Sequence, residues 1–265
     1  MPLLNEFLGD YFQTAAAQDR LSHCILFYGQ DLQAQYDLAL EIARMLNCTG
    51  DEECLNCKWI RENKHPAVLT ISKVDNKPAD DESSTVISVA QARMIKNDLL
   101  VTSDYHRVLI FCDKDKDGNI CALNETNFQA ETANALLKIL EEPPANTTFF
   151  FLTKDKTDMI STIISRSQSF FVPSNKEENR DFSLVKDLMD WYLGIERTQV
   201  LEFNDKLLEL TKENDPEEIF TQMQNYLAPH RRDAIKAIEI AKKQLKLNMN
   251  IQTIVENLVF NLVLS

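Results

Sequence analysis

Apolar residues in the first two thirds of the chain form short continuous runs that are separated by longer segments with helical spacing. The short runs predict buried strands at 24–28, 68–72, 107–112 and 148–153. The helical spacing predicts helices at 3–19, 32–46, 89–100 and 132–142. The last of these helices stops before Pro143, because proline has no amide hydrogen and clashes with the preceding turn. Buried strands that alternate with amphipathic helices predict an α/β fold with a parallel sheet covered on both faces.

The pattern changes after Val172. Residues 173–183 are mostly polar and charged, as expected of a linker. From Phe182 onward the apolar positions keep helical spacing, and no strand pattern appears. We therefore expect an α/β domain at 1–172, a linker at 173–183 and an all-α domain at 184–265.

Composition and charge narrow the classes of function. No apolar run approaches the roughly 20 residues that a membrane-spanning helix needs, and the N-terminus lacks the pattern of a signal peptide. The sequence is therefore expected to be that of a soluble, cytoplasmic protein without a membrane partner. The formal net charge of −13 opposes tight binding to DNA, which is itself a dense line of negative charge. Any role with nucleic acid is expected to be indirect, through a basic partner.

Three segments carry longer motifs, and together they resemble one family. The segments are 134–144 (NALLKILEEPP), 162–168 (TIISRSQ) and 20–29 (RLSHCILFYG). They are similar to a helix, to the Ser-Arg-Cys motif and to the strand entering the phosphate loop in bacterial clamp-loader subunits of the AAA+ class. The resemblance covers about residues 1–172 closely and the helical tail loosely. It implies an AAA+ P-loop-type parallel sheet sandwiched by helices, followed by a C-terminal all-α collar-like domain.

The sequence departs from the family's motifs at the positions of the nucleotide site. A phosphate loop needs Gly-x-x-x-x-Gly-Lys-[Ser/Thr], because the glycines let backbone amides surround the phosphates, the lysine neutralises charge and the hydroxyl holds magnesium. The corresponding positions hold Gly29, Ala34, Gln35 and Tyr36. The strand that ends in Asp-Glu in active members ends here in Asp113-Lys114, and a lysine cannot polarise the attacking water. The chain is expected to bind no ATP, although an ordinary strand–turn–helix that never held ATP predicts the same.

The family resemblance implies a functional role for Arg166. A phosphoryl-transfer transition state spreads negative charge over oxygens that a guanidinium fork can stabilise. In the family, the arginine of the Ser-Arg-Cys motif is presented to the ATP of an adjacent motor subunit. The resemblance therefore implies that Arg166, beside Ser165, is a trans arginine finger, and that Ser167 replaces the usual cysteine. Taken alone, the same residues also fit a capped helix end with a surface salt bridge.

Three of the six cysteines, Cys48, Cys54 and Cys57, are spaced like metal ligands. Members of the family often carry a four-cysteine zinc site at this place, so the resemblance implies Zn²⁺ bound by these three residues. The fourth cysteine would be expected at Ile60, which cannot bind a metal, and His65 is the candidate for the fourth ligand. A degenerate site with free thiols is the alternative.

Two further segments depart from familiar patterns. Asp113-x-Asp115-x-Asp117-Gly118 copies the first half of a calcium loop, but the twelfth position is Asn124 instead of glutamate. A solvated acidic insertion is the preferred interpretation. Few residues separate Gln168 from the first predicted tail helix, so the lid that follows in the family is expected to be reduced or absent.

The function implied by the resemblance is that of a non-catalytic subunit of the DNA polymerase III clamp loader. Its expected partners are motor (gamma/tau-type) and delta subunits and the sliding clamp, with primed DNA contacted indirectly through the complex. Two alternatives from other classes remain. One is a free-standing ATPase with an atypical phosphate loop, which nucleotide binding by the isolated chain would favour. The other is a zinc-dependent adaptor protein.

Overall fold

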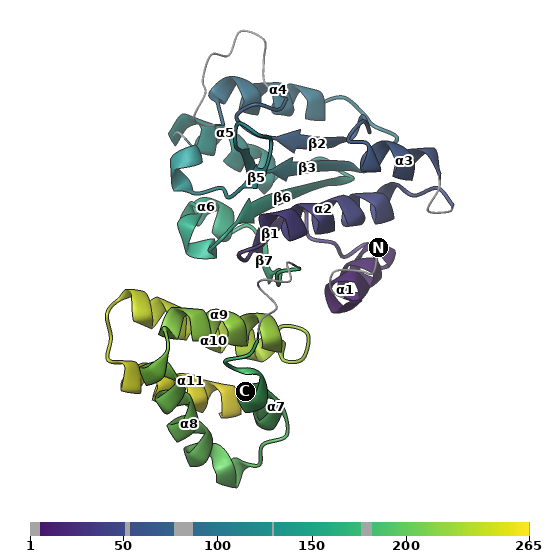
Figure 1. Cartoon of the computed structure of the whole chain (residues 1–265). Coiled ribbons are helices and arrows are strands. Elements are labelled where there is room, and N and C mark those ends of the chain that lie inside the picture. Colours follow the sequence, from purple (N-terminus) through teal and green to yellow (C-terminus); the bar gives the residue numbers. More distant parts are fainter. Residues whose placement is uncertain (1–5, 51–53, 77–86, 129, 176–181, 265) are drawn as a thin grey trace. The chain divides into compact units, whose positions relative to one another are not determined.

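A computed structural model describes residues 6–50, 54–76, 87–128, 130–175 and 182–264 (Figure 1). The chain divides into two compact units, Met1–Val172 and Pro173–Ser265. The division lies where the composition changes from α/β-like to helical. Of the predicted linker at 173–183, residues 176–181 lie outside the described part of the chain.

The first unit is built on a parallel five-stranded sheet. Its strands are β1 (Cys24–Tyr28), β2 (Val68–Ile71), β3 (Arg107–Phe111), β6 (Thr147–Thr153) and β7 (Gln168–Phe171). They lie in the order β2-β3-β6-β1-β7, and every pairing is parallel. The predicted parallel sheet is confirmed. The strand β7, which begins two residues after Arg166, was not predicted by the apolar pattern.

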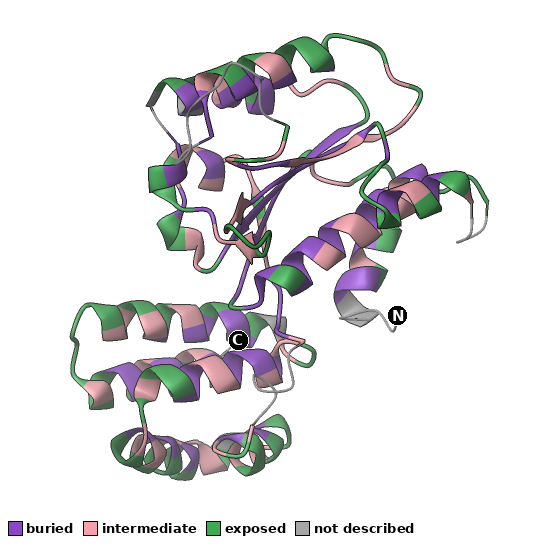
Figure 2. Ribbon diagram, turned by 45° about the horizontal axis from the view of Figure 1, so that its top comes forward, coloured by how far each residue is buried: buried purple, intermediate pink, exposed green. Residues whose placement is uncertain are grey.

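Helices cover both faces of this sheet (Figure 1). They are α1 (Glu6–Ala17), α2 (Leu32–Asn47), α3 (Leu55–Arg61), α4 (Val89–Leu99), α5 (Ala130–Glu141) and α6 (Ser161–Ile164). Residues of α1, α2 and α3 share a core with Ile25 and Phe27 of β1, whereas α4, α5 and α6 share one with Leu26. Successive side chains of a strand point to opposite faces. Because both faces are covered, the central strands are buried throughout, which explains their continuous apolar runs (Figure 2).

Gly29, which directly follows β1, is required by the local backbone conformation. Its φ is +144°, and a Cβ at this position would collide with the carbonyl oxygen of Val172. Its amide donates to the carbonyl of Lys154 at 3.1 Å. Only glycine allows such a close approach at positive φ, so the one glycine of the predicted loop has a purely structural reason to be there.

The acidic segment after β3 forms a small hairpin. Its antiparallel strands are β4 (Asp113–Lys114) and β5 (Ile120–Cys121), and Gly118 has φ +84° in the turn. Oδ1 of Asp115 accepts the amides of Asp117 and Asn119, each at 2.9 Å. The Asp115 carboxylate therefore stabilises its own turn by accepting hydrogen bonds from the backbone. Short 3₁₀ helices follow at Glu125–Asn127 and Lys156–Asp158.

The second unit is all-helical in its described residues, 182–264. Its elements are α7 (Lys186–Leu193), a 3₁₀ turn (Arg197–Gln199), α8 (Val200–Glu213), α9 (Pro216–Leu227), α10 (Arg232–Lys246) and α11 (Ile251–Leu264). They enclose a separate core that includes Met189, Phe203, Phe220, Ile238 and Leu258. The predicted all-α region is confirmed. No helix in the described parts of the chain is long and apolar enough to cross a bilayer.

Candidate functional site

The positions of the predicted phosphate loop lie between the end of β1 and the start of α2, and a carboxylate of the chain itself occupies this helix end. Asp31 is only 2% exposed, and its Oδ1 accepts the amide of Ala34 at 3.1 Å as the N-cap of α2. Free amides at a helix N-terminus are what makes it a phosphate site. Here a phosphate would meet a donor that is already bound and a carboxylate of like charge.

Gln35 holds the position of the phosphate-binding lysine, but it faces inward. Its side chain is fully buried, and Nε2 donates to the carbonyls of Gly29 at 2.9 Å and Thr153 at 3.0 Å. The amide therefore ties the loop to the end of β6. The next residue, Tyr36, is buried as well, and its hydroxyl is hydrogen-bonded to Thr70 Oγ1 at 2.7 Å. Burial raises the pKa of Tyr36, so the hydroxyl stays neutral.

Two ion pairs hold Asp113 and Lys114, the residues predicted to replace the Asp-Glu pair of an active nucleotide site. Asp113 Oδ2 lies 3.1 Å from Lys73 Nζ, and Lys114 Nζ lies 2.9 Å from Asp75 Oδ2. Burial alone would lower the pKa of Lys114, but the hydrogen bond and charge of Asp75 outweigh it and raise the pKa. A charged lysine thus stands where an active member has glutamate, and the neighbouring aspartate already has a cationic partner.

Arg166 lies two residues after the end of α6, and its side chain is about one third exposed. Its Nη1 donates to the carbonyl of Thr162 at 3.1 Å and to Ser165 Oγ at 3.3 Å, and its Nη2 lies 2.5 Å from Glu141 Oε1. Ser165 Oγ in turn donates to the Thr162 carbonyl. The guanidinium is therefore at the surface of the first unit, held by the last turn of α5. Glu141 lies in the motif at 134–144, but only the structure reveals that it pairs with Arg166.

Ser167 fixes the residue beside Arg166 to the sheet. Its Oγ donates to the carbonyl of Ile163 at 2.7 Å and lies 3.0 Å from Cys24 Sγ in β1. Burial raises the pKa of Cys24 to about 11, and the contact with Ser167 only partly offsets this. The serine that replaces the usual cysteine therefore anchors the motif to β1, so Arg166 is presented from a fixed base.

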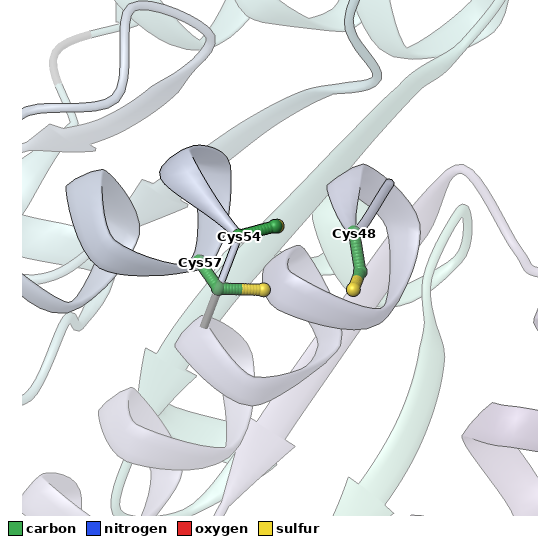
Figure 3. A group of neighbouring side chains, drawn as sticks. All are labelled: Cys48, Cys54 and Cys57. Atoms are coloured by element: carbon green, nitrogen blue, oxygen red, sulfur yellow. The ribbon is translucent and has the colours of Figure 1, made fainter. Parts of the chain in front are cut away.

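The cysteines predicted as metal ligands are brought together by two helix ends (Figure 3). Cys48 follows α2, Cys54 precedes α3 and Cys57 lies in its first turn. The three sulfur atoms lie within 4.8 Å of one another. Hydrogen bonding from the backbone of Thr49 and Cys57 lowers the pKa of Cys54 to about 6. Burial, with the neighbouring thiols, raises the pKa of Cys57 to about 11.

The structure does not bring His65 to these sulfurs. Its buried ring packs against Tyr105, with centroids 4.9 Å apart, and its Nδ1 accepts the amide of Ala67 at 3.2 Å. Ile60, at the position of the family's fourth cysteine, is 1% exposed within the core of the first unit. Among the described residues the cluster holds three ligands, and the prediction of His65 as the fourth is not supported. A zinc ion with Zn–S bonds of about 2.3 Å spaces its sulfurs by about 3.8 Å, so the three sulfurs fit part of such a site.

A family model described as "DNA polymerase III, delta subunit" matches residues 5–176. The chain belongs to this family. The predicted resemblance to bacterial clamp-loader subunits is therefore confirmed. The match ends close to the boundary between the two units, so it covers the sheet, the segment between β1 and α2, the cysteine cluster and Arg166.

Curated relatives of this family agree with the match. The chain is 28% identical over 178 residues to the DNA polymerase III subunit delta' of Bacillus subtilis, covering 64% of this chain and 48% of that protein. It is 30% identical over 129 residues to the delta' subunit of Buchnera aphidicola from Acyrthosiphon pisum, covering 48% and 34%. The tau subunit of Bacillus subtilis is 27% identical over 172 residues, covering 62% and 27%. The chain thus spans about half or less of the length of these relatives.

Among solved structures, a DNA polymerase III gamma subunit-related protein from Thermotoga maritima is similar at 19% identity. The alignment covers 95% of this chain and 98% of that one, with a TM-score of 0.43.

Proposed function

We propose that this chain acts as a non-catalytic, delta-prime-type subunit of the clamp-loader complex of DNA polymerase III, in which ATP-dependent loading of the sliding clamp onto primed DNA is driven by other subunits. The observation that carries the non-catalytic part is the filled N-terminus of α2. Asp31 takes the amide of Ala34, and Gln35 binds backbone carbonyls in place of a lysine that would bind phosphate. The relatives named delta' and tau support membership of such a complex.

Arg166 is proposed as this subunit's contribution to hydrolysis. It would enter the ATP site of a neighbouring motor subunit of the gamma/tau type, while a delta subunit, the clamp and primed DNA complete the assembly. The position is favourable because the guanidinium lies at the surface, on a segment that Ser167 anchors to β1. A planar guanidinium binds two phosphate oxygens at once, which a lysine cannot do.

In this role, Arg166 would give up its ion pair with Glu141 in order to bind the phosphate of the neighbouring subunit's ATP. Glu141 is about half exposed, and such surface ion pairs contribute only about 0.2–1 kcal/mol. A trans arginine typically accelerates phosphoryl transfer by roughly 10³–10⁵-fold, which corresponds to about 4–7 kcal/mol. Releasing Glu141 therefore costs far less than the transition state gains, and Glu141 can hold Arg166 in place before assembly.

The test is ATP hydrolysis by the reconstituted complex with motor, delta and clamp subunits, stimulated by primed DNA. Arg166→Ala is expected to reduce the rate at least about tenfold, because the transition-state charge loses its donor. Glu141→Ala is the matched control, since it removes the same ion pair but keeps the guanidinium, and it is expected to retain hydrolysis. Size-exclusion chromatography first establishes that both variants assemble.

Equal rates for the wild type and Arg166→Ala in assembled complexes would refute the role of Arg166. A loss in both variants would assign the effect to the ion pair and not to the arginine. Calorimetry of the isolated chain with ATP tests separately whether the chain itself binds nucleotide. Binding at micromolar ATP would contradict the non-catalytic assignment and favour a free-standing ATPase.

A further inference from the structure

We infer that the cavity between α4, β2 and the segment 100–106 binds a small monocarboxylate with an apolar body, whose carboxylate pairs with Arg107 (Figure 1). The cavity has a volume of about 390 Å³, which is within the roughly 300–1,000 Å³ typical of small-molecule sites. It lies in the first unit alone, and the inference does not depend on the proposed role of Arg166.

The apolar part of the cavity is an extension of the core beneath α4. It is lined by Leu69 and Ile71 of β2, Leu109 of β3, and Ile95 and Leu99 of α4, which all belong to the same apolar cluster. Alternate residues of a strand point to one face, and helical residues four apart share a face, so these side chains converge. They offer a ligand an apolar surface and no hydrogen-bonding group.

Arg107, at the start of β3, is the one cationic residue that lines this cavity. Its Nη1 donates to the carbonyl oxygen of Asp98 at 3.3 Å. Its Nε is shielded from solvent and has no hydrogen-bond partner among the described residues. A buried donor without a partner is costly, and the long arginine side chain can turn toward the cavity by a change of rotamer alone. A ligand that supplies an acceptor therefore satisfies this donor on binding.

A carboxylate fits Arg107 because the Nε and Nη2 hydrogens of an arginine point the same way and bind two oxygens together. Arg231 in the second unit shows this arrangement, since its Nε and Nη2 both donate to the carboxylate of Asp233. In Arg107 the Asp98 carbonyl is bound to Nη1, so the Nε–Nη2 edge is left for a ligand. Asp98 and Asp104 also border the cavity, but both are exposed, and salt and water screen exposed charges.

The outer edge of β2, beside the cavity, is already hydrogen-bonded within the chain. The amide of Val68 donates to the carbonyl of His65 at 3.2 Å, and the carbonyl of Thr70 accepts Nδ2 of Asn76 at 2.7 Å. A peptide that adds a strand to a sheet needs such edge groups for its own hydrogen bonds. The occupant is therefore a small molecule and not an added peptide strand.

Binding of 2-naphthoate to the full chain tests the inference, with 2-naphthamide as the uncharged probe of nearly the same shape. Isothermal titration calorimetry is expected to give a dissociation constant below about 1 mM for the acid and at least about tenfold weaker binding for the amide. Arg107→Gln is expected to weaken binding of the acid at least about tenfold and to leave the amide unchanged, because it removes the charged fork.

Arg93→Gln is the matched control. It removes an exposed arginine of α4 that does not line this cavity, so it is expected to bind the acid like the wild type. Circular dichroism establishes that each variant is folded.

The methionine methyl groups locate the probe. Met94 of α4 lines the cavity, whereas Met189 lies in the core of the second unit. In a chain labelled at the methionine methyls, the NMR signal of Met94 is expected to move on titration with 2-naphthoate, and that of Met189 is expected to stay. Leu69→Trp, which fills the cavity with a larger side chain, is expected to abolish the movement.

Three results would overturn the inference. One is a folded wild-type chain that binds 2-naphthoate no more tightly than 2-naphthamide, and another is an unchanged affinity for the acid in Arg107→Gln. The third is saturable binding that leaves the Met94 signal in place, because the probe would then lie elsewhere. The first two results do not require Leu69→Trp to fold, and none of the three involves another subunit of the proposed complex.

Discussion

At the scale of single residues, the chain's own groups occupy the start of α2, where the family resemblance places a phosphate loop. The Asp31 carboxylate accepts a hydrogen bond from a backbone amide at the start of α2, and the Gln35 side-chain amide donates to two backbone carbonyls. Each satisfies buried polar groups that would otherwise be costly to leave without a partner. The same contacts that argue against a phosphate at this helix start therefore also satisfy buried backbone groups of the fold.

His106 supplies a residue-scale prediction about pH. Burial lowers its pKa, partly opposed by the charge of Asp19, and its Nε2 lies 2.8 Å from Thr148 Oγ1. Because the unfolded chain binds the proton first as pH falls through about 6.5, the free energy of unfolding must fall there too, by at most about 1.4 kcal/mol per pH unit for one group. His106→Gln, which keeps a hydrogen-bonding group, is expected to flatten part of this dependence.

Urea unfolding of both proteins between pH 8 and pH 5 measures this effect. Burial lowers the pKa of His65 as well, so the variant should keep a residual dependence in the same direction. An identical loss of stability in wild type and variant on acidification would contradict the contribution of His106.

At the scale of elements, the cap of α2 can be tested directly. Asp31→Ala is expected to lower the free energy of unfolding of the first unit by about 1 kcal/mol, because the helix loses its N-cap. It is not expected to create ATP binding, since Gln35 still occupies the lysine position. Asp215→Ala is the matched control, because Asp215 caps α9 in the second unit. Thermal or urea unfolding, followed by the fluorescence of Trp59 for the first unit and of Trp191 for the second, gives the measurement.

Long elements were predictable from the sequence because their periodicity extends over many residues. The strand at Cys24–Tyr28 and the helix beginning at Leu32 agree with the predicted ranges within one residue. Several short elements were missed, among them β7 and α6. The helix α3 lies in a segment interpreted as a metal-binding loop, and β4 and β5 have only two residues each, which is too short for any period to appear.

The sequence could nominate candidate site residues but could not reveal their contacts. The sequence identified Gln35, Arg166 and the three cysteines through family motifs and spacing. It could not reveal that Gln35 turns inward, that Glu141 holds Arg166, or that His65 packs against Tyr105. Each of these contacts either joins segments far apart in sequence or depends on the direction of a side chain. Such features leave no pattern among neighbouring residues of the sequence.

At the scale of the whole molecule, each unit has its own core and its own tryptophan. The chain contains two tryptophans, Trp59 in α3 and Trp191 in α7. Units with separate cores and a polar connection are expected to unfold independently. Trp59→Phe and Trp191→Phe should therefore give fluorescence transitions with different urea midpoints, each reporting the unit that keeps its tryptophan.

This arrangement can be checked in two ways. The fragment 173–265 alone is expected to give the circular dichroism of a folded helical protein and a midpoint equal to that of the Trp59→Phe variant. Coincident transitions from both single-tryptophan variants, together with an unfolded fragment, would show instead that the two units form one cooperative body.

The inward-facing Gln35 has a consequence for how this sequence can change. Restoring lysine at position 35 alone would place an ammonium group among buried carbonyls while Asp31 still occupied the neighbouring amide. Removing Asp31 alone would uncap α2 without supplying a phosphate-binding lysine. Each of these two substitutions alone is therefore expected to lower stability before a bound nucleotide could compensate for the loss. Under the proposed non-catalytic role, selection for a stable fold therefore acts against each of these two substitutions, even where ATP binding would be an advantage.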